Sequence, residues 1–130
     1  MKTVTFEGVD CTIAIRRPAD RVSVIVITGK DRGEHGDAPM RELSADLERG
    51  PIALFVDARG TIGANLDVSD RWARWLGANR ARFTRISMLT GSRFVQLTAE
   101  FVRRFSELGE LMHIYTDPVA FETALSLSCA

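Results

Sequence analysis

The sequence predicts an α/β protein with a mixed, largely parallel sheet flanked by about four helices. Two continuous apolar runs, residues 22–28 and 52–56, are typical of strands that are buried on both faces. Beyond the first strands, apolar runs alternate with segments of helical periodicity. This alternation indicates right-handed crossovers with helices on the faces of the sheet. We therefore treat residues 1–130 as one domain of ordinary size.

The first half of the chain contains the predicted antiparallel strands. Alternating apolar and polar residues predict strands at residues 3–7 and 11–16, before the central run at 22–28. The polar, glycine-rich segment 29–39 predicts a mobile loop. A helix follows and ends at a Gly-Pro pair at residues 50–51. Its expected buried face consists of Met40, Leu43 and Leu47.

The second half of the chain predicts three further helices. Asp67, with Asp70 in the first turn, predicts the start of one helix after a loop at residues 59–64. Further strands are expected at residues 86–89 and 111–115. The first of these helices is expected to turn one face inward, which consists of Val68, Trp72, Trp75, Leu76, Asn79 and Phe83. The inward face of the second is expected to consist of Phe94, Leu97, Thr98, Phe101, Phe105 and Leu108. A terminal helix is expected to start at Asp117-Pro118 and to turn Phe121 and Leu125 inward.

The composition excludes several classes of protein. The formal net charge is zero, so no global field favours nucleic acid or a membrane surface. No apolar stretch approaches the roughly 20 residues that span a bilayer, and the first residues lack the apolar run of a signal peptide. Cys11 and Cys129 have no metal-binding spacing and suit a reducing compartment. We therefore expect a cytoplasmic protein without a membrane span.

The sequence encodes no recognisable catalytic centre. No nucleophile–base pair, metal-ligand set or cofactor fingerprint is present, so we expect no enzyme activity, no metal and no cofactor. Residues 29–36 lack the hydroxyl and the register of a phosphate-binding loop. Asp57 is expected at the carboxyl end of a buried strand, where open α/β sheets place ligands. The alternative is that Asp57 caps a loop or pairs with Arg59.

The order of predicted elements and three segments carry a family resemblance. PIALFVDARG at 51–60, DVSDRWARWL at 67–76 and IYTDPVAFETAL at 114–125 resemble the STAS/SpoIIAA-like superfamily, from about Cys11 onward. The resemblance implies a non-enzymatic regulatory module with the fold of an anti-sigma-factor antagonist. In such antagonists a serine at a helix start is phosphorylated, and the nearest position here is Ser69. The compact Asp-Ser-Ser/Thr-Gly turn of that group is absent, which favours the SpoIIAA-like branch, proposed to bind partners or small apolar ligands.

Two binding hypotheses follow. A partner protein would bind the loop-helix region from Asp57 to Arg74. Alternatively, a small apolar ligand or lipid would bind along the helix that carries Trp72 and Trp75, in a pocket that also includes Asn79 and Phe101. The candidate residues are Asp57, Ser69, Trp72, Arg74, Trp75 and Asn79.

Each polar candidate also has a structural interpretation. Ser69 would cap a helix, and Asn79 would bond to a neighbouring backbone group. Between Arg71 and Arg104 there are eight arginines and one acid, Glu100, which suits an acidic partner or, alternatively, solvated helix faces paired elsewhere. No recognition motif for nucleic acid is present. A homodimer through a sheet edge is consistent with the pattern.

Overall fold

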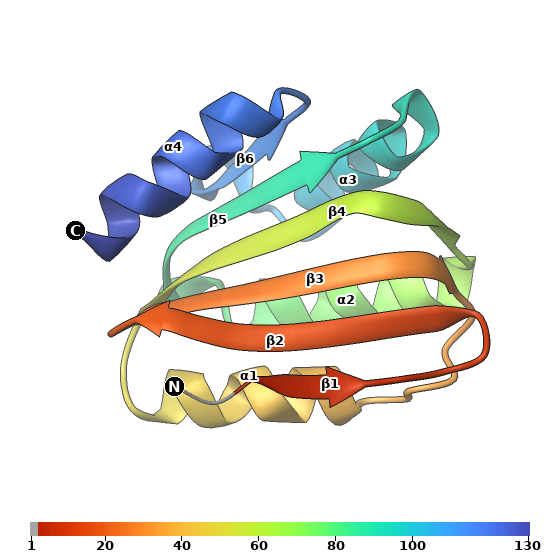
Figure 1. The fold of residues 1–130 in the computed structure, drawn as a ribbon, viewed down its shortest axis with the longest axis horizontal. Coiled ribbons are helices and arrows are strands. Elements are labelled where there is room, and N and C mark those ends of the chain that lie inside the picture. Colours follow the sequence, from red (N-terminus) through yellow and green to blue (C-terminus); the bar gives the residue numbers. More distant parts are fainter. Residues whose placement is uncertain (1–2) are drawn as a thin grey trace.

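A six-stranded sheet forms the centre of the computed structural model, which describes residues 3–130 (Figure 1). In chain order, which is also their order in the sheet, the strands are β1 (Val4–Phe6), β2 (Cys11–Ala19), β3 (Val22–Asp31), β4 (Ile52–Ala64), β5 (Phe83–Thr90) and β6 (Met112–Tyr115). The first three strands pair antiparallel, and β3 to β6 pair parallel. The predicted α/β class with a mixed, largely parallel sheet is confirmed.

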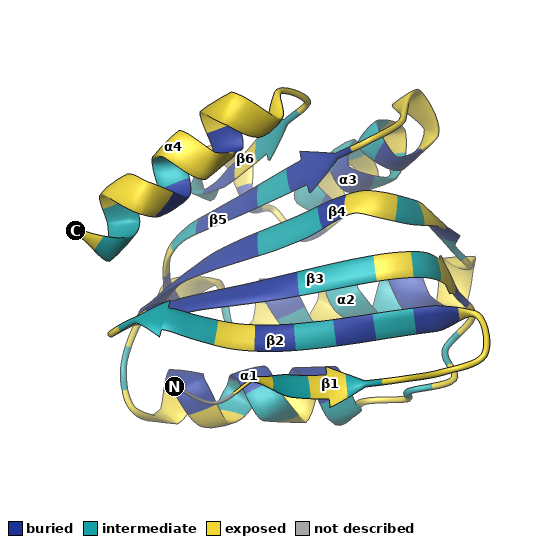
Figure 2. Cartoon of the chain, in the orientation of Figure 1, coloured by how far each residue is buried: buried dark blue, intermediate teal, exposed yellow. Residues whose placement is uncertain are grey.

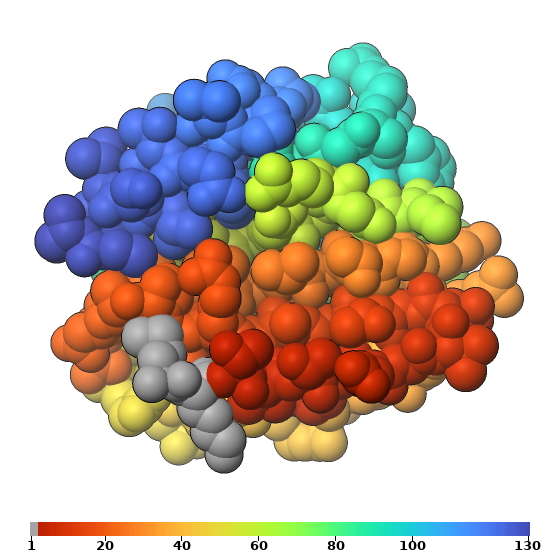
Figure 3. All heavy atoms as spheres, viewed as in Figure 1, coloured from red at the N-terminus to blue at the C-terminus, as the bar shows by residue number. Residues whose placement is uncertain are grey.

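The helices are distributed unequally over the two faces of the sheet. They are α1 (Ala38–Glu48), α2 (Leu66–Ala78), α3 (Arg93–Phe105) and α4 (Pro118–Cys129), and short 3-10 turns at Arg80–Arg82 and Gly109–Leu111 precede β5 and β6. Helices α1 to α3 pack on one face, because each connects parallel strands in the same right-handed sense. Helix α4 packs on the opposite face over β5 and β6, and it leaves β1 and β2 open on that side (Figure 3).

The central strands β3 and β4 are buried on both faces, as their apolar runs predict (Figure 2). Ile25 and Leu54 belong to the core beneath α1 to α3, whereas Val24 and Phe55 belong to the core beneath α4. The ring of Phe55 meets the ring of Phe121 edge to face, with centroids 5.7 Å apart. The residues predicted to face inward from α1 and α4, which are Met40, Leu43, Leu47, Phe121 and Leu125, are all buried.

Strands β3 and β4 extend further than the sequence predicts. The expected loops at residues 29–39 and 59–64 are wrong in part, because the strands continue to Asp31 and Ala64 and pair with each other there. The extensions contain glycine and polar residues, which have low strand propensity. Ladder hydrogen bonds to the neighbouring strand satisfy their backbone groups, so tertiary pairing overrides the local preference.

Helix α2 begins at Leu66, and its N-cap is Asn65 instead of the predicted Asp67. The Asn65 Oδ1 atom accepts a hydrogen bond from the Val68 N–H at 2.9 Å. Asp67 lies in the first turn, where its charge interacts favourably with the helix dipole but does not cap the helix. The prediction was wrong because asparagine and aspartate suit an N-cap equally, and the strand before Asn65 was expected to be a loop.

Helix α3 turns a different face to the sheet from the one that its periodicity predicts. Phe94, Leu97, Phe101 and Phe105, which were expected inside, are 52–62% exposed. The buried residues are the smaller Val95, Ala99 and Val102. Small side chains let α3 approach α2 closely, and the Ser106 hydroxyl donates a hydrogen bond to the Ala73 carbonyl at 2.7 Å. Leu108 is buried, as predicted.

Within residues 3–130, no helix is both long enough and apolar enough to cross a membrane.

Candidate functional site

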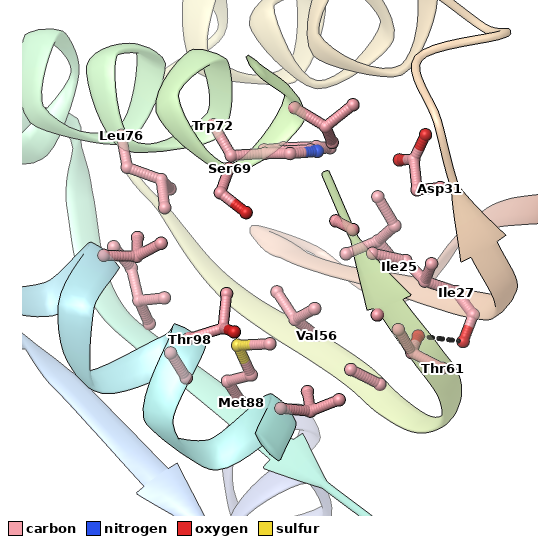
Figure 4. Close-up of a pocket in the computed structure, with 18 of the residues that line it drawn as sticks. Ile25, Ile27, Asp31, Val56, Thr61, Ser69, Trp72, Leu76, Met88 and Thr98 are labelled. Carbon is pink, nitrogen blue, oxygen red and sulfur yellow. Dashed lines mark hydrogen bonds between the residues drawn. The ribbon is translucent and has the colours of Figure 1, made fainter. Parts of the chain in front are cut away.

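A cavity of about 100 Å³ lies between the sheet and helices α2 and α3 (Figure 4). Its walls are almost entirely apolar and include Ile25, Val56, Trp72, Leu76, Met88 and Val102. The space exists because α3 directs small residues such as Ala99 toward the sheet and its phenylalanines outward. An apolar cavity of this kind suits a small apolar molecule.

Few polar groups border the cavity, and most of them are already hydrogen-bonded. The Thr61 hydroxyl donates to the Ile27 carbonyl at 2.9 Å, and the Thr98 hydroxyl donates to the Phe94 carbonyl at 3.2 Å. The Ser69 hydroxyl points into the cavity without a hydrogen bond to the other residues drawn (Figure 4). Asp31 also lines the cavity, and its carboxylate accepts a hydrogen bond from the Gly33 N–H at 2.9 Å. Among the hydroxyl groups of the lining, that of Ser69 is therefore the best placed to meet a molecule inside.

Ser69 lies one turn inside α2 and is 7% exposed, so it does not cap the helix. Ser69 is the nearest position to the serine that is phosphorylated in anti-sigma-factor antagonists. Its side chain is buried in the wall of the cavity and is not presented on the surface to a kinase. The same burial leaves Ser69 available to a ligand within the cavity.

The structure brings together only part of the predicted ligand pocket. Trp72 lines the cavity, as expected, but Phe101 is exposed on the outer side of α3. Trp75 instead stacks edge to face on Phe83, which begins β5, with ring centroids 5.7 Å apart. Its indole N–H donates to the Ser44 hydroxyl at 3.0 Å, which ties α2 to α1. Trp75 therefore supports the cavity wall from behind.

Asn79 caps the C-terminal end of α2 and does not reach the cavity lining. Its side-chain amide donates to the Trp75 carbonyl at 2.9 Å. The sequence leaves two roles open for Asn79, a hydrogen bond to a neighbouring backbone group or a place in the ligand pocket. The structure shows the first.

Asp57 lies within β4 and not at the end of the strand, on the face that α4 covers. Its carboxylate accepts hydrogen bonds from Nε and Nη2 of Arg59 at 3.1 and 2.9 Å. The same guanidinium donates to Glu122 of α4 at 3.0 Å. The pairing with Arg59 that the sequence leaves open for Asp57 is therefore present. The sheet separates Asp57 from Ser69 and Trp72.

Four of the eight arginines in the arginine-rich segment have an acidic partner. Arg74 is exposed on α2 and pairs with Asp70 one turn earlier at 2.8 Å. The other ion pairs are Arg71 with Asp37, Arg80 with Glu107, and Arg103 with Glu100. These four arginines therefore match the structural interpretation, in which the arginines lie on solvated helix faces and pair with acids of the same chain. Among the described residues, no group of three or more His, Cys, Asp or Glu side chains could hold a metal ion.

The second candidate site is an exposed apolar surface that the sequence did not predict. We define the α3 stripe as Phe94, Leu97, Phe101 and Phe105. Phe101 and Phe105 stack with centroids 5.6 Å apart and planes 17° from parallel. At the other end, the ring of Phe94 lies over Gly63, 3.1 Å from the position that a Cβ atom would take there. The stripe thus runs along the outside of α3, opposite the wall of the cavity.

Comparison with solved structures identifies the fold. A protein of the DUF3478 family from Shewanella loihica PV-4, itself described as having a SpoIIAA-like fold, aligns over 95% of this chain and 98% of its own, with a TM-score of 0.63 and 16% identity. This chain has a SpoIIAA-like fold. The predicted resemblance to the STAS/SpoIIAA-like superfamily is thereby confirmed at the level of fold.

Two further structures share the SpoIIAA-like fold. An anti-sigma factor antagonist from Mycobacterium paratuberculosis aligns over 89% of this chain and 94% of its own, with a TM-score of 0.59 and 15% identity. The anti-sigma factor antagonist SpoIIAA in its unphosphorylated form aligns over 88% and 96%, with a TM-score of 0.53 and 19% identity. No protein-family model matches the sequence, and no curated protein matches it significantly.

Proposed function

We propose that this chain is a regulatory module that binds a partner protein through the α3 stripe. The proposal depends on one observation, the exposure of four large apolar side chains on one face of a helix. Burial of such surface is worth roughly 25 cal/mol per Å², and contiguous exposed apolar patches mark interaction sites. The SpoIIAA-like fold supports the same function, since two proteins that share it are anti-sigma factor antagonists.

The α3 stripe differs from the partner surface that the sequence predicted, the region from Asp57 to Arg74. Asp57 is bound by Arg59 beside α4, and Ser69 and Trp72 border the cavity. Arg74 is accessible but already paired with Asp70. This region also exposes two large apolar side chains, Ile62 and Leu66, whereas the neighbouring helix α3 exposes four along one face.

Photocrosslinking in cells that naturally produce the protein tests this function. We expect a photoreactive phenylalanine analogue at Phe101 to form a covalent adduct with one other protein. The control places the same analogue at Leu127, which is 73% exposed on α4. Leu97→Glu should abolish the adduct at Phe101, because a charge in the middle of the stripe cannot be buried without a partner. Absence of an adduct at Phe101, or equal adducts at both positions, would reject the proposal.

The cavity supports a second candidate function, binding of a small apolar molecule. The supporting observation is the Ser69 hydroxyl, which points into a largely apolar cavity of about 100 Å³ (Figure 4). A ligand with one hydrogen-bonding group and a short apolar body would satisfy it. Native mass spectrometry of gently purified protein should then show an added mass that Ser69→Leu removes. Bare protein at every step of purification would exclude this function.

A further inference from the structure

The charges beside the α3 stripe indicate the chemistry of its partner. Arg93 and Arg104 lie on the outer side of α3 and are exposed. At 100° per residue, both project within about half a right angle of Leu97, along one edge of the stripe. They are 11 positions apart in the sequence, so they border almost its whole length, roughly 16 Å.

Neither arginine forms a salt bridge within residues 3–130, although acids are nearby. Glu100 pairs with Arg103 at 3.0 Å, and Glu107 pairs with Arg80 at 3.5 Å. The edge of the stripe therefore presents two guanidinium groups without carboxylate partners. An arginine fork binds a carboxylate in two parallel hydrogen bonds, so each group is a ready site for an acidic side chain.

A second copy of the chain is a poor occupant of the stripe. Antiparallel packing of α3 on its copy would place Arg93 of one copy beside Arg104 of the other at both ends. Parallel packing would place the arginines of the two copies on opposite edges of the interface, where no acid of the stripe faces them. The first arrangement brings like charges together, which costs free energy at an interface, and the second leaves the guanidinium groups without a carboxylate partner.

An anionic membrane is also disfavoured. Polybasic segments that bind anionic lipids contain about four to eight lysines and arginines. The outer side of α3 offers two unpaired arginines, and the helix also carries an acid, Glu100. A narrow apolar stripe with two separated cations fits one helix better than it fits a lipid surface.

We infer that the α3 stripe binds an amphipathic helix of a partner protein whose apolar face is bordered by Asp or Glu residues. The apolar face covers Leu97 and Phe101, and the acidic residues pair with Arg93 and Arg104. The inference deepens the proposed function and rests on it, since it specifies the partner of the same surface.

A displayed peptide library tests the inference directly. The peptides are roughly four helical turns long. Their apolar face varies among Leu, Ile, Val, Phe and Met, and their flanking positions vary among Glu, Lys, Gln and Ala. Selection on the wild-type protein should enrich Glu at the flanking positions. Selection on the double variant Arg93→Glu/Arg104→Glu should enrich Lys instead, and a peptide selected on the wild type should bind this variant at least about tenfold more weakly.

Charged substitutions at apolar positions of the α3 stripe show where the peptides bind. Leu97→Glu/Phe101→Glu should abolish binding of the selected peptides. The matched control is Val119→Glu/Leu127→Glu, which places the same charges on exposed apolar positions of α4 and should leave binding unchanged. The inference is overturned if no peptide is enriched, if the flanks show no preference for Glu, or if the charge-reversed variant keeps its affinity.

Other outcomes separate this inference from the proposed function. If no protein adduct forms at Phe101, both the proposed function and the acidic-helix inference fail. An adduct that persists undiminished in Arg93→Glu/Arg104→Glu retains the proposed function and overturns the acidic helix. A dimer in sedimentation that Leu97→Glu dissociates would assign the stripe to a second copy. Binding to vesicles of phosphatidylcholine and phosphatidylglycerol that Phe101→Glu abolishes would assign it to a membrane.

Discussion

The carboxylate of Glu34 accepts hydrogen bonds from three consecutive backbone N–H groups where the connection between β1 and β2 enters β2. Val9, Asp10 and Cys11 donate to it at 2.8–3.1 Å. Desolvation opposes its ionisation, but these hydrogen bonds and the charge of His35 outweigh that effect and lower the pKa of Glu34. A residue between β3 and α1 thus secures the start of β2.

Glu34→Gln should therefore change stability in a pH-dependent way. When the folded pKa is lowered, the ionised carboxylate stabilises the fold above its ordinary pKa, and this contribution is lost as the pH falls through the folded value. We expect the variant to have a lower free energy of unfolding than the wild type near neutral pH, and this gap should close in acid. Urea titrations across pH measure the gap. Glu7→Gln, at an exposed position in the same connection, is the control. A gap that is constant across pH would contradict this account.

The two cysteines should differ sharply in reactivity. Burial, followed by the charges of Asp31 and Glu34, raises the pKa of Cys11 to about 11. Because the thiolate is the reactive form, Cys11 should resist iodoacetamide in the folded protein, whereas Cys129 near the C-terminus should react. Mass spectrometry should find one label on the native protein and two in urea. Cys129→Ser should take up no label until it unfolds, and rapid native labelling of that variant would contradict the burial of Cys11.

At the scale of single elements, α3 shows why periodicity alone misplaced a helix face. The helix has two apolar faces, and a pattern that weights hydrophobicity favours the larger side chains of the stripe. The inner set of Val95, Ala99 and Val102 recurs at i, i+4 and i+7, and this spacing is the signal that could have identified it. Which face of α3 is buried depends on how closely α2 packs against it, and the sequence of α3 alone does not specify this packing.

Substitutions on the two faces of α3 should have opposite consequences. Ala99→Asp should lower the free energy of unfolding by about 3–5 kcal/mol, because Ala99 is buried and the new carboxylate would have no charged partner there. Phe101→Ser should change it by less than about 0.5 kcal/mol, as is usual for exposed positions. Urea titration measures both. If Phe101→Ser cost several kcal/mol while Ala99→Asp were tolerated, the helix would be turned the other way.

At the scale of the whole molecule, the alternation of apolar runs and periodic segments predicted the fold class, the mixed sheet and the buried central strands. The cavity and the α3 stripe could not be predicted in the same way, because both depend on how the helices pack against each other and against the sheet. Trp72 lines the cavity as expected, but Trp75 and Asn79 are drawn to Ser44 and to the backbone of α2. Those hydrogen bonds depend on tertiary neighbours, so the pattern of the helix could not separate ligand-facing from structural residues.

Filling the cavity tests how its two helical walls and the sheet work together. Ser69→Leu adds apolar atoms where the hydroxyl points into about 100 Å³ of space. Each buried methylene is worth about 0.8 kcal/mol, and the packing strain of a larger side chain offsets part of this. We expect the free energy of unfolding to rise by about 1 kcal/mol, measured by urea titration, whereas Ser126→Leu on the exposed side of α4 should have little effect. A loss of stability in Ser69→Leu would mean that α2 and α3 leave no usable space. If the filled variant retains the adduct at Phe101, the stripe on the outside of α3 acts independently of the cavity on its inside.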